Sequence, residues 1–90
     1  MKEREVAIGH PLGLHARAAA KLVQLSSKFQ SNIILVRAAD LNDVKPVEAD
    51  ARSILSILLL AAGYGSKLQV RVEGSDEDEA IDKVCEYLEG

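Results

Sequence analysis

Residues 13–17, Gly-Leu-His-Ala-Arg, place a nucleophile and a cation where a short loop becomes a predicted helix. A helix start leaves backbone N–H groups unpaired and carries the positive end of the helix dipole, so it favours an anion such as phosphate. His15 stands at this start, and imidazole can accept and release a phosphoryl group. Arg17 can hold phosphate oxygens with its forked guanidinium. The segment predicts a site for a transient phosphohistidine or another bound anion.

Residue chemistry alone leaves a second interpretation open, in which His15 is an ordinary surface residue that caps a helix weakly. Gly13 permits a tight turn, and the small Ala16 leaves the helix end open. A cation in the first helical turn is unfavourable unless an anion is held there, which favours a functional role for Arg17. His10 has no evident metal-ligand partner, and we expect it to be a loop residue.

The residues around this segment predict four strands. Val6 and Ile8 lie on one face of an alternating segment at residues 3–8. The other expected strands are residues 33–36, rich in β-branched side chains, and residues 68–72, which alternate clearly. A weaker strand is expected near Val44, Val47 and Ala49, after a turn at Leu41, Asn42 and Asp43, and Pro46 places it at a sheet edge or a bulge.

Three helices are expected between these strands. The first begins near Ala16 and carries an apolar stripe made of Ala18, Leu22, Leu25 and Phe29. The second covers residues 53–62, with Ser53 or Asp50 as its N-cap, and ends at Gly63, Tyr64 and Gly65. The third is capped by Ser75, has acidic residues 76–79 in its first turn, and buries Ile81, Val84, Cys85 and Leu88. The order predicts an α+β two-layer sandwich: one antiparallel sheet with the helices on one face.

Composition limits the function classes. The 90 residues are 48% hydrophobic and 28% charged, which predicts one globular domain over residues 1–90. The net charge of −3 and only three aromatic residues argue against nucleic-acid binding. The single cysteine excludes an intrachain disulfide and a cysteine-based metal cluster. No signal-like segment is present, and the longest apolar run, residues 57–62, is too short to span a bilayer, so we expect a cytoplasmic protein without membrane insertion.

The second helix suggests a partner surface. Its residues Ile54, Leu55, Leu58 and Leu59 make it apolar nearly all round, so a small domain cannot bury every face. Exposed apolar patches usually mark docking sites. Ser53 is explained as an N-cap serine, but a phosphate at a helix start would also be tolerated, so it is a candidate for regulatory phosphorylation.

These segments together resemble a known family. The 13–17 motif, followed by an alanine-rich helix, is similar to the active-site motif of HPr, the histidine-containing phosphocarrier of the bacterial phosphoenolpyruvate–sugar phosphotransferase system. Residues 52–58 resemble the family's regulatory-serine helix, residues 65–74 its last strand, and the closing acidic-capped helix also fits. The resemblance implies an open-faced sandwich with four antiparallel strands and three helices, in the order βαββαβα.

The resemblance also implies roles for particular residues. His15 would receive a phosphoryl group on Nδ1 from phospho-enzyme I and pass it to a IIA component, with Arg17 and the backbone amides of Ala16 and Arg17 holding the phosphate. Ser53 would be the site of an HPr kinase/phosphorylase. Docking would use Lys21 with Ile54, Leu55 and Leu58. No cofactor or metal is implied, and a carrier that visits several partners would work as a monomer.

Two departures from the family accompany this resemblance. The family usually has proline where this chain has Ala18, and the stretch 37–50 is about seven residues longer than the usual short hairpin. Alanine keeps the helix and adds one N–H donor. Two alternatives stay open: a regulatory relative that acts through partner binding, and a small module that binds a phosphorylated metabolite.

Overall fold

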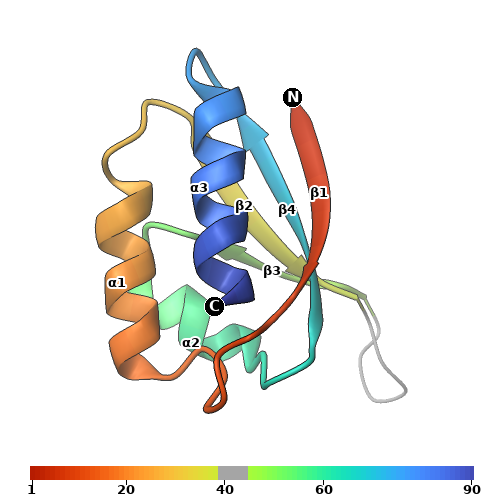
Figure 1. Cartoon of the computed structure of the whole chain (residues 1–90). Helices are drawn as coiled ribbons and strands as arrows, with labels where there is room; N and C mark the ends of the chain where they lie inside the picture. The colour runs from red at the N-terminus through yellow and green to blue at the C-terminus, as the bar shows by residue number, and fades with distance from the viewer. Residues whose placement is uncertain (39–44) are drawn as a thin grey trace.

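The computed structural model describes residues 1–38 and 45–90, and within them the chain forms one antiparallel sheet and a set of helices. The predicted α+β class and the order βαββαβα are both confirmed (Figure 1). The strands are β1 (Lys2–Ala7), β2 (Asn32–Arg37), β3 (Val47–Asp50) and β4 (Lys67–Glu73), and the helices are α1 (Ala16–Ser26), α2 (Ile54–Leu60) and α3 (Glu77–Glu89).

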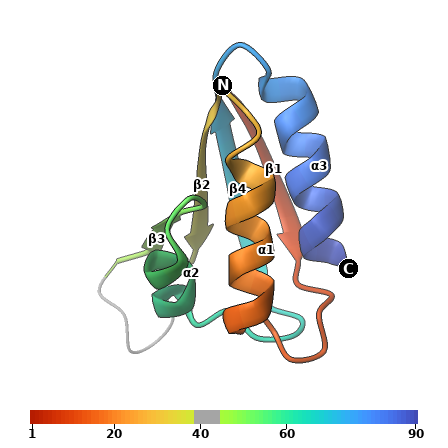
Figure 2. The ribbon, with the colours of Figure 1, turned by 90° about the vertical axis from the view of Figure 1, so that its left-hand side faces the viewer.

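The sheet order is β1-β4-β2-β3, so the last strand in sequence lies between the first and the second. Strand β4 pairs antiparallel with both neighbours, with Leu68 opposite Val6 of β1 and Val70 opposite Leu35 of β2. Helices cover one face of the sheet and leave the other face open (Figure 2). This arrangement explains the clear alternation in β4, because only one of its faces packs against helices.

The core between sheet and helices is aliphatic. Leu22 of α1, Ile57 of α2 and Val84 of α3 are all fully buried. Cys85 is also buried, as predicted for a packing residue. Its burial raises the pKa of the thiol, because an apolar environment disfavours the thiolate.

The start of α3 differs from the prediction. Asp76, not Ser75, is the N-cap residue, and its side chain makes no capping hydrogen bond to the helix. The carboxylate instead accepts hydrogen bonds from the backbone N–H of Gln30 (2.9 Å), the backbone N–H of Ser31 (3.0 Å) and the Ser31 hydroxyl. The prediction of Ser75 as the cap was wrong by one residue. The Asp76 side chain does not cap the helix either, because its carboxylate binds donors on the α1–β2 loop.

The ends of the first two helices also differ from the prediction. Helix α2 ends at Leu60, because Ala61 adopts the left-handed conformation (φ 54°) and its N–H donates to the carbonyl of Leu58. The Arg37 side chain then donates to the Leu60 carbonyl at 2.8 Å. Helix α1 ends at Ser26, so Phe29 packs against the core from the loop beyond the helix.

The β2–β3 connection is described only in part. Strand β3 lies at the edge of the sheet, which is one of the two placements that Pro46 predicted, and it begins at Val47. The expected turn at Leu41, Asn42 and Asp43 and the expected strand residue Val44 lie outside the described residues.

Asp76→Asn tests the connection between α3 and the α1–β2 loop. The Ser31 hydroxyl, followed by the backbone N–H of Gln30, lowers the pKa of Asp76. A lowered folded-state pKa means that this stabilisation is present above the unfolded value of about 4 and is lost as the pH falls through the folded value. We therefore expect Asp76→Asn to lower the free energy of unfolding at pH 7 and to weaken its dependence on pH below about 4.

Urea unfolding of both proteins from pH 7 down to about pH 2 measures this effect. Glu79→Gln is the matched control, because it removes one carboxylate charge from an exposed position in the first turn of the same helix. An Asp76→Asn variant with the stability and acid response of Glu79→Gln would contradict the assignment.

Candidate functional site

His15 is the N-cap residue of α1, and its side chain makes no capping hydrogen bond. Its backbone is extended (φ −73°, ψ 179°), and its carbonyl accepts the hydrogen bond from the N–H of Ala19 at 2.8 Å. The backbone therefore starts the helix while the half-buried imidazole stays available for other contacts. The N–H groups of Ala16, Arg17 and Ala18 belong to the first helical turn, where no intrahelical acceptor exists.

The loop before His15 is fixed by the loop that follows α2. The Leu14 N–H donates to the Ala62 carbonyl at 3.0 Å, and the Leu14 side chain is buried. Gly13 has φ +69°, and a Cβ at this position would lie 2.7 Å from the Ala62 carbonyl oxygen and 2.8 Å from the Cα of Gly63. Glycine is required here both by the left-handed conformation and by the close approach of the two loops.

A small hollow of about 160 Å³ lies beside His15. It is lined by His10, His15, Arg17, Ala18, Lys21 and Tyr87. The structure thus brings together three of the predicted residues, His15, Arg17 and Lys21. Arg17 and Lys21 lie one turn apart on the exposed side of α1. Two cationic side chains and the helix start make this hollow compatible with a bound anion.

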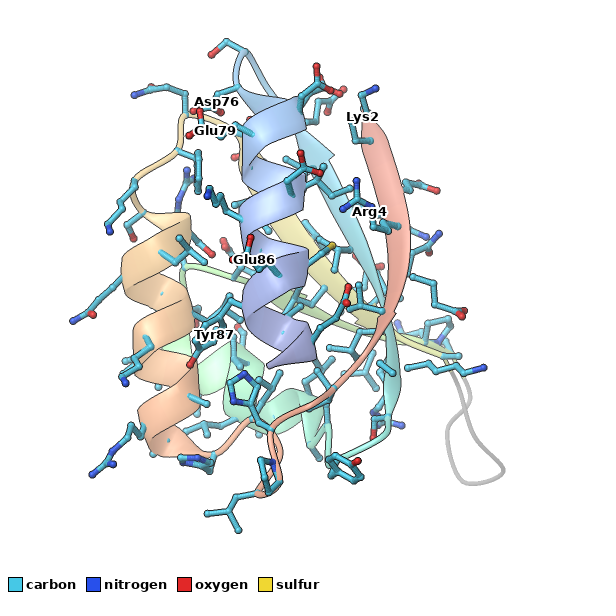
Figure 3. All side chains as sticks on the ribbon, in the orientation of Figure 1. Lys2, Arg4, Asp76, Glu79, Glu86 and Tyr87 are labelled. Atoms are coloured by element: carbon cyan, nitrogen blue, oxygen red, sulfur yellow. The ribbon has the colours of Figure 1, made fainter. Side chains whose placement is uncertain are left out.

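The sequence interpretation missed His10 and Tyr87 as parts of this site. His10 Nε2 lies 2.7 Å from the carbonyl oxygen of Tyr87, and the centroids of the His10 and Tyr87 rings are 4.8 Å apart. Figure 3 labels Tyr87 on α3 beside α1, and its hydroxyl donates to the Ala18 carbonyl at 3.3 Å. No local pattern could have revealed this cluster, because His10 and Tyr87 are 77 residues apart in the chain.

The second predicted group lies on α2, which packs beside α1 (Figure 2). Ser53 is the N-cap, as predicted, and its hydroxyl accepts a hydrogen bond from the Ser56 N–H at 3.3 Å. Part of the helix is exposed, also as predicted. We call this surface the α2 apolar face; it comprises Ile54, Leu55, Leu58 and Leu59, whose exposed fractions are 43%, 67%, 38% and 68%.

Two further properties concern the described residues, 1–38 and 45–90. No three His, Cys, Asp or Glu side chains among them are grouped closely enough to hold a metal ion. None of the helices in these ranges combines the length and the apolar character needed to cross a membrane.

Comparisons with known proteins agree with this fold and site. A sequence model described as the PTS HPr component phosphorylation site matches residues 2–90. The chain is 45% identical to phosphocarrier protein HPr of Xylella fastidiosa strain Temecula1, over 99% of this chain and 92% of that protein. It is 38% identical to phosphocarrier protein NPr of Shewanella violacea, over 97% of this chain and 88% of that protein.

The crystal structure of HPr from Bacillus anthracis superposes with a TM-score of 0.84 at 31% identity, covering 97% of this chain and 95% of that chain. The open-faced sandwich with a histidine at the start of α1 therefore places the protein in the class of small phosphocarriers. Within that class, the chain belongs to the HPr family of the phosphotransferase system.

Ala18 departs from the family pattern without interrupting α1. The helix is continuous from Ala16, and the Ala18 side chain is buried. Its carbonyl accepts the hydrogen bond from Tyr87, while its N–H belongs to the first turn, where a proline would leave no donor. Alanine therefore adds one backbone donor at the helix start.

Proposed function

We propose that His15 accepts a phosphoryl group from phospho-enzyme I and passes it to a IIA component of the phosphotransferase system. The observation that carries the proposal is the free imidazole of His15 at an open helix start, in one hollow with Arg17 and Lys21. In this proposal the whole chain, residues 1–90, acts as one monomeric carrier domain in the cytoplasm and needs no cofactor or metal.

The transfer is an in-line displacement at phosphorus. The lone pair of His15 Nδ1 attacks the phosphorus of the donor phosphohistidine, one N–P bond forms as the other breaks, and the donor imidazole leaves with the bonding electrons. The proton of His15 remains on Nε2 during attack. Arg17 and the backbone N–H groups of Ala16 and Arg17 stabilise the charge on the equatorial oxygens.

Onward transfer requires that the phosphoryl group is not bound too strongly. Arg17 and Lys21 are both exposed, so solvent screens their charges. The hollow is small, and the same atoms that hold the phosphoryl group can release it to the next histidine. This arrangement suits a protein substrate in a relay better than a free-standing catalyst.

Docking of successive partners is assigned to the α2 apolar face together with Lys21. Leu55 and Leu59 each expose about two thirds of their surface, although burial in the core would stabilise them. Helix α2 lies beside α1, so a partner that covers Leu55 and Leu58 approaches the helix that carries Lys21. The apolar face supplies affinity and the cation supplies orientation.

Ser53 is assigned as the site of an HPr kinase/phosphorylase. Its half-buried hydroxyl stands at the start of α2 and directly precedes the exposed Ile54 and Leu55. A phosphate on Ser53 would add about −2 charge at a helix start, where it is tolerated, and beside an apolar docking face, where it opposes desolvation. Phosphorylation would therefore weaken docking without unfolding α2.

The His15 assignment predicts one acid-labile phosphoryl group after incubation with phosphoenolpyruvate and enzyme I from the same organism, read by intact mass. His15→Ala should gain none, because it lacks the accepting nitrogen. The chain has only two histidines, so His10→Gln is the matched control and should still gain the group at completion. A wild-type protein that stays unmodified would defeat the proposal. Partner binding without phosphorylation would favour the regulatory alternative. A tight non-covalent complex with a phosphorylated metabolite would favour the small-ligand-binding module.

The docking assignment predicts that Leu55→Ala raises the KM for phosphorylation by enzyme I about tenfold and leaves kcat nearly unchanged, since most of the contribution of a buried leucine is lost in the complex. Steady-state kinetics with varied carrier concentration measure both constants. Tyr64→Ala is the control, because Tyr64 is 70% exposed but lies outside α2. Equal KM values for the two variants would remove Leu55 from the docking surface.

The Ser53 assignment predicts one acid-stable phosphoryl group with ATP and the cognate kinase. Ser53→Ala should remain unmodified, whereas Ser56→Ala, in the next position that bears a hydroxyl on α2, should be modified normally. Phosphorylation should raise the KM for enzyme I. A group that survives the Ser53→Ala substitution would show that another residue is the target.

A further inference from the structure

The loop between β1 and His15 is attached to the last turn of α3 at two consecutive residues. The Gly9 N–H donates to the Leu88 carbonyl at 2.9 Å, and His10 Nε2 lies 2.7 Å from the Tyr87 carbonyl. A carbonyl oxygen only accepts, so the ring nitrogen of His10 carries the proton and donates. Carbonyls in the last turn of a helix lack the usual intrahelical partner. The Tyr87 carbonyl also accepts from the Gly90 N–H at 3.2 Å, and the loop supplies one donor to each of the Tyr87 and Leu88 carbonyls.

Tyr87 connects the same loop to the helix that follows His15. Its ring packs against His10 at a centroid distance of 4.8 Å, and its hydroxyl donates to the carbonyl of Ala18 in the first turn of α1. The His10 carbonyl in turn accepts from the Gly13 N–H at 2.9 Å. The segments before and after His15 are therefore both in contact with one residue of α3, Tyr87.

His10 and Tyr87 also line the hollow beside His15, next to Arg17 and Lys21. The His10 ring is half-buried, and its hydrogen bond fixes the edge that it turns toward α3. The two ring side chains and the two cations of α1 thus line the same small hollow.

We propose that His10 is a positioning residue for the carrier histidine: its hydrogen bond to the Tyr87 carbonyl holds the 10–15 loop so that the His15 ring presents Nδ1 to the donor phosphorus. The kinetic part of this inference rests on the proposed function; the structural part does not. His10 itself accepts no phosphoryl group in this scheme, and its role is exerted through the loop. Misplacement of a reacting group by about 1 Å can lower a rate by up to two orders of magnitude, so even a loose loop has a measurable effect.

The test uses His10→Ala, which removes the donor, and His10→Gln, whose side-chain N–H can reach the same carbonyl. Lys83→Ala is the control, because Lys83 is an exposed residue one turn before Tyr87 on α3. The first measurement is the 15N and 1H resonances of the His15 ring in the free protein, which needs no enzyme I. The second is kcat and KM for phosphorylation by phospho-enzyme I. Backbone amide spectra establish that each variant is folded.

We expect His10→Ala to shift and broaden the His15 ring resonances and to lower kcat about tenfold with little change in KM. His10→Gln should restore both to near the wild-type values. The proposal is overturned if His10→Ala behaves as Lys83→Ala, if Gln rescues no better than Ala, or if the resonances shift while kcat does not fall. If the wild type accepts no phosphoryl group at all, the proposed function fails, and the ring resonances still decide whether His10 positions His15.

Discussion

The contact between the loop before His15 and the loop after α2 is the constraint on which the rest of the site depends. The Leu14 N–H donates a hydrogen bond to the Ala62 carbonyl, and Gly13 permits the two loops to approach closely. These two features fix where α1 begins. Because this contact fixes the loop through its backbone, the His15 side chain is not needed as a cap and stays available for chemistry. The open helix start, the adjacent cations and the hollow all follow from that placement.

Helix α2 shows how stability and recognition are divided along one short element. Seven residues are too few to form a stable helix in isolation, so its stability must come from its ends and from its buried side. The Ser53 hydroxyl satisfies an N–H at one end, the Arg37 side chain satisfies the Leu60 carbonyl at the other, and Ile57 is buried between them. With both ends satisfied, the opposite side of the helix can expose leucines without unfolding.

Local patterns were sufficient for most of the fold. The alternation of apolar and polar residues predicted β4. The motif with Gly13 and His15 predicted the start of α1, and Ser53 before an apolar run predicted the N-cap of α2. These predictions succeeded because each depends on residues within about one turn or one strand of one another. The motif at 13–17 also predicted that His15 and Arg17 would lie together at the helix start. The structure adds Lys21, which lies one turn beyond Arg17 and lines the same hollow.

The sequence by itself thus determined the element order, the α+β class and the placement of a nucleophile and one cation, Arg17, at one helix start. Only the tertiary structure decided which distant groups the polar side chains bind. Asp76 binds the α1–β2 loop instead of capping α3, and His10 and Tyr87 meet beside His15 across 77 residues. The physical reason is that a polar side chain bonds to whichever donor or acceptor the packed fold brings within about 3 Å, and no spacing along the chain encodes that neighbour.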